Sequence, residues 1–118
     1  MTTTKILHIL IIIGLTLPRL GFSNTLDDIT FMTEIYPPYN FKEKNMIKGI
    51  SVDVLELMFK KLDSNKTRKD IKILPWARSY FYLQNNKNTA LFSMTRTPKR
   101  ENIFKWVGPI TSTTISLI

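Results

Sequence analysis

Hydrophobic and polar residues divide the chain into a short apolar stretch and a longer region patterned for strands and helices. The stretch Ile6–Leu17 is almost wholly apolar and follows a single cation, Lys5. It is shorter than the roughly 20 residues that a membrane-spanning helix needs, and it has the layout of a secretory signal. Gly21 and Ser23 supply the small residues of a cleavage site, so we expect cleavage before Asn24. A retained membrane anchor is the alternative interpretation.

The pattern after Asn24 begins with a strand and a loop. Ile29–Thr33 carries apolar or β-branched residues on both faces, which predicts a strand inside a sheet. The YPPY motif at Tyr36–Tyr39 ends this strand, because proline cannot donate a hydrogen bond to a ladder. Asn40–Lys48 places a polar turn between apolar residues, and this arrangement predicts a small hairpin or loop.

Helical spacing follows and then alternates with further strands. Ser51 is a suitable N-cap, and the apolar residues behind it at helical spacing are Val52, Leu55, Met58 or Phe59, and Leu62. The later patterns predict strands at Ile71–Leu74, Thr89–Met94 and Phe104–Val107, a short helix at Ala77–Leu83 and a helical turn at Thr97-Pro98. This order implies an α/β fold with right-handed crossovers and a mainly parallel sheet.

Composition excludes several kinds of site. The chain has no cysteine, and its one histidine, His8, lies in the predicted signal. We therefore expect no catalytic residues, no metal site and no cofactor. Without Lys5 and Arg19, 15 of the 17 Lys and Arg residues remain against 9 acidic residues, a net charge of +6. These charges form no long block of one sign, so we interpret them as solvated surface and not as a nucleic-acid site.

Polar and aromatic residues follow the carboxyl ends of the predicted strands. In open parallel sheets ligands bind at this edge. Aromatic faces, hydroxyls and guanidinium groups together suit a small zwitterion, because a guanidinium holds a carboxylate through two parallel hydrogen bonds. The candidates are Tyr36 and Tyr39 after the first strand, Trp76 and Arg78 after the second, and Ser93, Thr95, Arg96 and Arg100 after the third.

Four short segments add a more specific indication. They are Gly49–Asp53 (GISVD), Pro75–Arg78 (PWAR), Ser93–Glu101 (SMTRTPKRE) and Phe104–Pro109 (FKWVGP). Their sequences, order and spacing resemble those of the bacterial extracellular solute-binding proteins of family 3, over about residues 29–110. The resemblance implies an α/β, type II periplasmic-binding-protein-like fold, of which this chain forms an incomplete first lobe with a mainly parallel sheet flanked by helices.

The resemblance also implies roles for the candidate residues. In the family an arginine holds the α-carboxylate of the ligand, hydroxyl and backbone groups bind the carboxylate and the amine, and aromatic rings stack on the ligand. These roles fall on Arg100, with Arg96 one turn earlier as the alternative, on Ser93 and Thr95, and on Trp76 with either Tyr36 or Tyr39.

We therefore expect residues 1–23 to be a signal peptide and residues 24–118 to be part of the amino-terminal lobe of a solute-binding domain. The expected function is the periplasmic solute-binding component of an ABC-type uptake system. Its partners are an amino acid or similar small polar solute and a membrane permease, without nucleic acid. The alternatives are a ligand-sensing module of a larger receptor or cell-wall enzyme, and a truncated product that binds nothing.

A few other residues have simpler structural interpretations. Phe104 and Trp106 suit a packed core, and Arg78 suits an ion pair at the start of a helix. Asp53 complements a helix dipole, and Glu34, which might otherwise bind a cationic ligand, suits an exposed surface.

Overall fold

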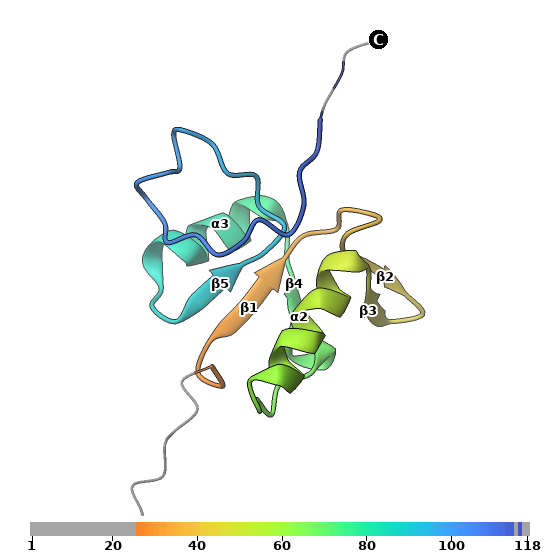
Figure 1. Ribbon diagram of the computed structural model, residues 1–118. Coiled ribbons are helices and arrows are strands. Elements are labelled where there is room, and N and C mark those ends of the chain that lie inside the picture. The colour runs from red at the N-terminus through yellow and green to blue at the C-terminus, as the bar shows by residue number, and fades with distance from the viewer. Residues whose placement is uncertain (1–25, 115, 117–118) are drawn as a thin grey trace, which may run out of the picture.

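The computed structural model describes residues 26–114 and 116 (Figure 1). The predicted signal peptide, residues 1–23, lies outside the described residues. Of the helices that are described, none combines the length and the hydrophobicity needed to cross a bilayer.

A three-stranded parallel sheet forms the centre of the fold (Figure 1). β1 (Thr30–Thr33) lies between β4 (Lys72–Ile73) and β5 (Thr89–Leu91). The predicted α/β architecture with a parallel sheet is thereby confirmed. The first strand occupies the inner position that apolar residues on both of its faces predicted.

Two helices cover the sheet. The cluster between the sheet and α2 (Ile50–Lys61) comprises Phe31, Val52, Leu55, Phe59 and Ile71. Phe31 and Phe59 meet edge to face with ring centroids 5.0 Å apart. Met32, the next residue of β1, points to the opposite face and is also buried. α3 (Trp76–Asn85) packs against β5 and β1, so both faces of the central strand are shielded from water.

A hairpin precedes α2, which is one of the two alternatives, hairpin or loop, that the sequence predicted. It consists of β2 (Phe41–Glu43) and β3 (Met46–Lys48), which pair antiparallel. Lys44 and Asn45 make the turn with φ angles of 47° and 63°, and asparagine tolerates this left-handed region better than most residues.

The start of α2 corrects the predicted cap. Ser51 is not the N-cap, because the helix begins at Ile50 and Ser51 is buried in its first turn. The N–H groups of Ile50 and Ser51 donate to the carbonyl oxygens of Pro38 and Tyr39 at 3.2 and 3.0 Å. The preceding loop thus supplies acceptors for the free N–H groups of the helix, and no side chain is needed for that purpose.

Some predicted bounds and faces also differ. Of the two alternatives for the apolar face of α2, Phe59 is buried and Met58 is exposed. Leu62 was also expected on this face, but it is exposed and follows the end of the helix. α3 is longer than the predicted Ala77–Leu83; its buried residue is Ser79, whereas Phe81 is exposed.

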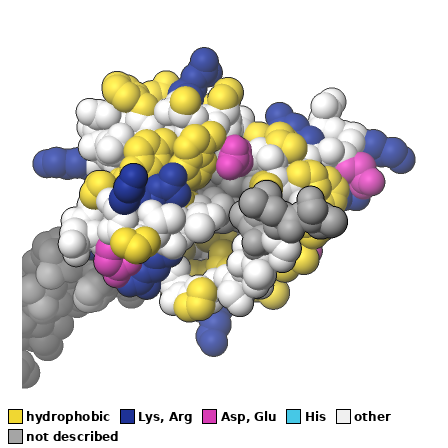
Figure 2. Space-filling model, turned by 90° about the horizontal axis from the view of Figure 1, so that it is seen from above, with side chains coloured by type: hydrophobic (Ala, Val, Ile, Leu, Met, Phe, Trp, Pro, Cys, Tyr) yellow, Lys and Arg dark blue, Asp and Glu magenta, His cyan; other side chains and the backbone are white. Residues whose placement is uncertain are grey.

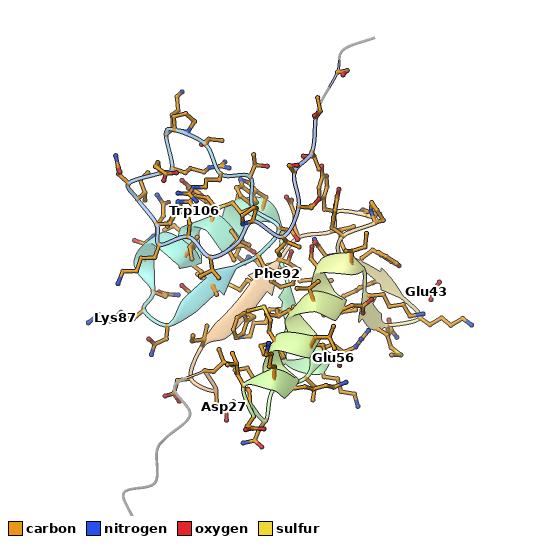
Figure 3. All side chains as sticks on the ribbon, in the orientation of Figure 1. Asp27, Glu43, Glu56, Lys87, Phe92 and Trp106 are labelled. Atoms are coloured by element: carbon orange, nitrogen blue, oxygen red, sulfur yellow. The ribbon has the colours of Figure 1, made fainter. Side chains whose placement is uncertain are left out.

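The predicted strand Phe104–Val107 is not a strand in the structure. β5 ends at Leu91, and the chain then leaves the sheet to pass over α3 (Figures 1 and 3). The expected helical turn at Thr97-Pro98 is a succession of turns without a helix, in which the N–H of Arg100 donates to the carbonyl oxygen of Thr97 at 2.9 Å.

Candidate ligand-binding site

A pocket of about 290 Å³ lies at the carboxyl ends of the strands. Figure 2 looks onto this end of the molecule and shows basic, acidic and hydrophobic side chains close together. The lining comes from the segments that follow all three strands, namely Glu34 and Tyr36 after β1, Trp76 after β4, and Ser93, Thr95 and Arg100 after β5. The structure therefore brings most of the sequence-predicted site residues to one hollow.

A closed loop positions Tyr36. The N–H of Tyr36 donates to the carbonyl oxygen of Asn40 at 2.7 Å, and the N–H of Asn40 donates back at 3.0 Å. Asn40 is fully buried, and its side-chain amide donates to the carbonyl oxygen of Glu34. These bonds hold the loop against the end of β1, so the ring of Tyr36 stays at the rim although it is 44% exposed.

Ser93 stands where the chain leaves the sheet. The N–H of Phe92 donates to the carbonyl oxygen of Met32 at 3.1 Å, and Thr33 Oγ1 donates to the carbonyl oxygen of Phe92 at 3.2 Å. The next residue, Ser93, has a φ of 59°, which is uncommon for a residue other than glycine. Its hydroxyl oxygen is buried and has no hydrogen-bond partner among the described residues, so it is available to a ligand in the pocket.

Arg100 is held in place by aromatic rings and one carbonyl. Its guanidinium carbon lies 5.0 Å from the ring centroid of Trp76 and 5.4 Å from that of Tyr80. Its Nη1 donates to the carbonyl oxygen of Thr95 at 3.0 Å. Cation–π contact restrains the guanidinium. Among the described residues Nη1 makes its one side-chain hydrogen bond, so the other N–H groups can bind an anion.

Three candidates from the sequence lie outside the pocket lining. Tyr39 stacks on Tyr36 with centroids 5.5 Å apart and so supports the ring that lines the pocket. Arg78 is exposed and makes no ion pair within the described residues. Arg96 binds both carboxylate oxygens of Glu101, which lowers the pKa of Glu101.

Trp106 completes the arrangement around Arg96. The guanidinium of Arg96 lies 5.5 Å from the Trp106 ring, and Trp106 in turn packs against Phe104. Figure 3 shows Trp106 on the segment that passes over α3. Phe104 meets Tyr80 of α3 edge to face at 5.5 Å. The two aromatic residues therefore support the pocket from behind without belonging to a strand.

Sequence reasoning undervalued two residues of the site. Glu34 was interpreted as surface, yet it is half-buried and lines the pocket. Its position directly after a buried strand was the available signal. Tyr80 was not among the predicted site residues, but its ring lies under Arg100. Its spacing of four residues from Trp76 places both rings on one helix face and was the signal for this contact.

A second hollow, of about 340 Å³, adjoins the first at Glu34. The rest of its lining is apolar and comes from the ends of β1 and β4, namely Ile35, Ile73, Leu74 and Pro75. Glu34 is the one residue common to the linings of these two hollows.

One family of proteins matches the part of the chain that forms the sheet, the two helices and the pocket. Residues 29–118 match the bacterial extracellular solute-binding proteins, family 3, and this range includes β1 to β5, both helices and every residue of the pocket. The chain belongs to this family. No curated protein and no solved structure matches it. Membership gives the family 3 protein a solute-binding role outside the cytoplasm and a type II periplasmic-binding-protein fold.

The chemistry available to this family 3 protein at the pocket is recognition by charge, hydrogen bonds and stacking. The described part of the chain contains no group of three or more His, Cys, Asp and Glu side chains that would hold a metal ion. A guanidinium, two hydroxyls and two aromatic rings instead face one hollow of small-molecule size.

Proposed function

We propose that the protein is the periplasmic solute-binding component of an ABC-type uptake system and binds an amino acid or a similar small polar solute. The observation that carries this proposal is the restrained Arg100, which shares one pocket with Ser93, Thr95 and Trp76. In this proposal Arg100 binds the carboxylate of the solute, and the nearby hydroxyls donate further hydrogen bonds to it.

Restraint of Arg100 favours tight binding. A long side chain loses rotamer freedom when it binds a ligand, and this loss reduces affinity. Because the rings of Trp76 and Tyr80 and the carbonyl oxygen of Thr95 already hold Arg100, much of that loss is incurred on folding. The exposed part of the Trp76 ring and the ring of Tyr36 then offer flat surfaces for the rest of the solute.

The first test replaces Arg100 with alanine in protein expressed from the intact gene. Calorimetric titration with a panel of L-amino acids identifies the tightest ligand of the wild type. We expect Arg100→Ala to weaken that ligand by roughly 30- to 1,000-fold, or about 2–4 kcal/mol, since a charge-assisted contact is lost. Arg78→Ala is the matched control, because Arg78 is exposed outside the pocket, and it should leave affinity unchanged.

Other outcomes of this test have defined meanings. Unchanged affinity in Arg100→Ala together with a loss in Arg96→Ala would move the carboxylate anchor by one turn. Unchanged affinity in both variants would refute the proposed site. If Arg100→Ala binds poorly but cells that carry it still accumulate the labelled ligand normally, a sensing role would be favoured over uptake.

A further inference from the structure

Two contacts close the loop that carries Arg100. In the first, Arg100 Nη1 donates to the carbonyl oxygen of Thr95 at 3.0 Å. The second joins the next residue at each end of the loop, where Arg96 Nε donates to Glu101 Oε2 at 2.7 Å and Arg96 Nη2 donates to Oε1. Residues 95–101 are therefore closed twice at the same base, once through the arginine of the pocket and once through an ion pair beside it.

Arg96 also connects this loop to α3. Its guanidinium carbon lies 5.5 Å from the centroid of the Trp106 ring, and Trp106 packs against Phe104. Phe104 meets the ring of Tyr80 in α3, and Arg100 lies over that same ring. Both arginines of the loop therefore rest on one group of aromatic side chains that is attached to α3.

The pair between Arg96 and Glu101 is exposed, so its effect is on the shape of the loop more than on stability. The two side chains are 54% and 42% exposed, and ion pairs at such exposure stabilise a protein little. A bidentate contact between a guanidinium and a carboxylate nevertheless fixes the direction of both groups. Arg100 is the residue directly before Glu101, so the direction of this end of the loop helps to set where the Arg100 side chain points.

We propose that Arg96 is a positioning residue, which holds the loop so that Arg100 faces the pocket. It acts through Glu101 and Trp106 and does not touch the solute itself. This inference rests on the proposed solute-binding function and on Arg100 as the anchor of the carboxylate. A group that is held in its binding position loses less conformational freedom when the solute arrives, so the solute binds more tightly.

The test measures affinity in Arg96→Gln, Glu101→Gln and the variant with both substitutions, in protein expressed from the intact gene. The probe is the standard L-amino acid that binds the wild type most tightly, titrated by calorimetry. We expect each single substitution to weaken binding by roughly 3- to 10-fold, which is the scale of one restrained contact. The variant with both substitutions should bind no more weakly than Arg96→Gln, because the two changes break the same pair.

Glu43→Gln is the matched control for the loss of an exposed ion pair. Glu43 binds Lys48 in the hairpin, and neither residue lines the pocket. We expect Glu43→Gln to leave affinity unchanged. Thermal unfolding shows which variants are folded, and if Arg96→Gln is not, Glu101→Gln and Arg96→Lys test the same pair.

Combination with Arg100→Ala distinguishes positioning from a general loss of structure. If Arg96 acts through Arg100, Arg96→Gln should change affinity by less than about twofold once Arg100 is already alanine. Ligand-observed NMR measures the weak binding of these variants. An equal loss from Arg96→Gln with and without Arg100→Ala would show that Arg96 supports the site as a whole, and it would overturn the proposal.

Other results would overturn the proposal while the solute-binding function stands. Unchanged affinity in Arg96→Gln and Glu101→Gln, with Arg100→Ala impaired, would remove the pair from recognition. A loss in Arg96→Gln as large as that in Arg100→Ala, with Glu101→Gln unchanged, would make Arg96 itself a contact of the solute. Failure of the wild type to bind any standard L-amino acid would overturn the proposed function and this inference with it.

Discussion

Gly49 is a residue whose lack of a side chain the structure requires. Its φ is +125°, and a Cβ at this position would overlap the carbonyl oxygen of Tyr39. That oxygen also accepts the N–H of Ser51 at 3.0 Å, so the loop cannot retreat without losing a bond at the start of α2. The loop in turn carries Tyr36 of the pocket. The conformation of Gly49 at the start of α2 thus helps to determine where the ring of Tyr36 lies in the pocket.

We predict that Gly49→Ala destabilises the protein by about 2–5 kcal/mol, because it combines a strained φ with overlap against backbone atoms. Chemical denaturation measures the loss. Gly108→Ala is the control, since Gly108 has a similar φ of +121° but its added Cβ would meet only the nitrogen of Ile110, at 3.1 Å. A loss in Gly49→Ala no larger than in the control would contradict the steric argument.

The site residues were predictable where topology decides their place. The carboxyl ends of parallel strands lie at one edge of a sheet, so the sequence alone predicted that Trp76, Ser93 and Arg100 lie close together. Glu34 was interpreted as surface, because its position directly after a strand places it at the correct edge of the sheet but does not determine whether its side chain turns into the pocket or into water. The contact between Arg100 and Tyr80 was also missed, since it depends on how the turns after β5 fold back over α3.

Arg68 joins three elements through its guanidinium. It lies in the short 3₁₀ helix η1 (Arg68–Asp70) and binds Asp53 and Glu56 of α2, while its Nη1 donates to the carbonyl oxygen of Ile47 in β3 at 3.3 Å. Figure 3 shows Glu56 on α2, and it is not among the residues that line the pocket. The predicted dipole role of Asp53 is thus accompanied by an ion pair that sequence spacing did not indicate, because the partners come from separate elements.

This ion-pair cluster should make stability depend on acid pH. The pKa of Glu56 lies below its ordinary value, chiefly because Arg68 donates hydrogen bonds to it. A carboxyl group whose pKa is lowered by folding stabilises the protein above its unfolded pKa, and this contribution is lost as pH falls through the folded pKa. We predict that Arg68→Gln costs about 1–2 kcal/mol at pH 7 and that the difference from wild type shrinks below about pH 4.

Unfolding by urea at pH 7 and pH 3 measures this effect. Arg78→Gln serves as the control, because Arg78 is exposed and has no ion pair in the described part of the chain. A difference between Arg68→Gln and wild type that stays constant over this range would show that the guanidinium acts by packing and not by charge.

Among the elements, the segment Phe104–Val107 was wrongly predicted as a strand, although its alternation of buried and exposed residues is real. Phe104 and Trp106 are half-buried, Lys105 between them is exposed, and Val107 is 88% exposed. This alternation of inward and outward residues is typical of a strand. Here it arises because the segment packs against Tyr80 of α3, without a neighbouring strand to pair with. Sequence periodicity indicates which side chains of a segment are buried, but it does not identify the element against which they pack.

At the scale of the whole molecule, the family match begins at Ile29, after the predicted cleavage site. We predict that export removes residues 1–23, so the periplasmic protein begins at Asn24. Mass spectrometry of the periplasmic fraction measures this directly. Replacement of Gly21 and Ser23 by bulky residues should block cleavage, because the peptidase accepts small side chains at these positions. A full-length, membrane-bound species in wild-type cells would contradict the prediction.

β1 is the first strand of the described chain and the middle strand of its sheet. Its two partners begin at Lys72 and Thr89, so each ladder it makes joins distant parts of the sequence. Such non-local pairings form slowly, because closing the long intervening loops costs entropy before the strand contacts are made. A nascent chain that has been synthesised only as far as residue 88 therefore cannot complete the sheet. A translocation channel that accepts only unfolded polypeptide would not have to unfold this sheet before the chain passes.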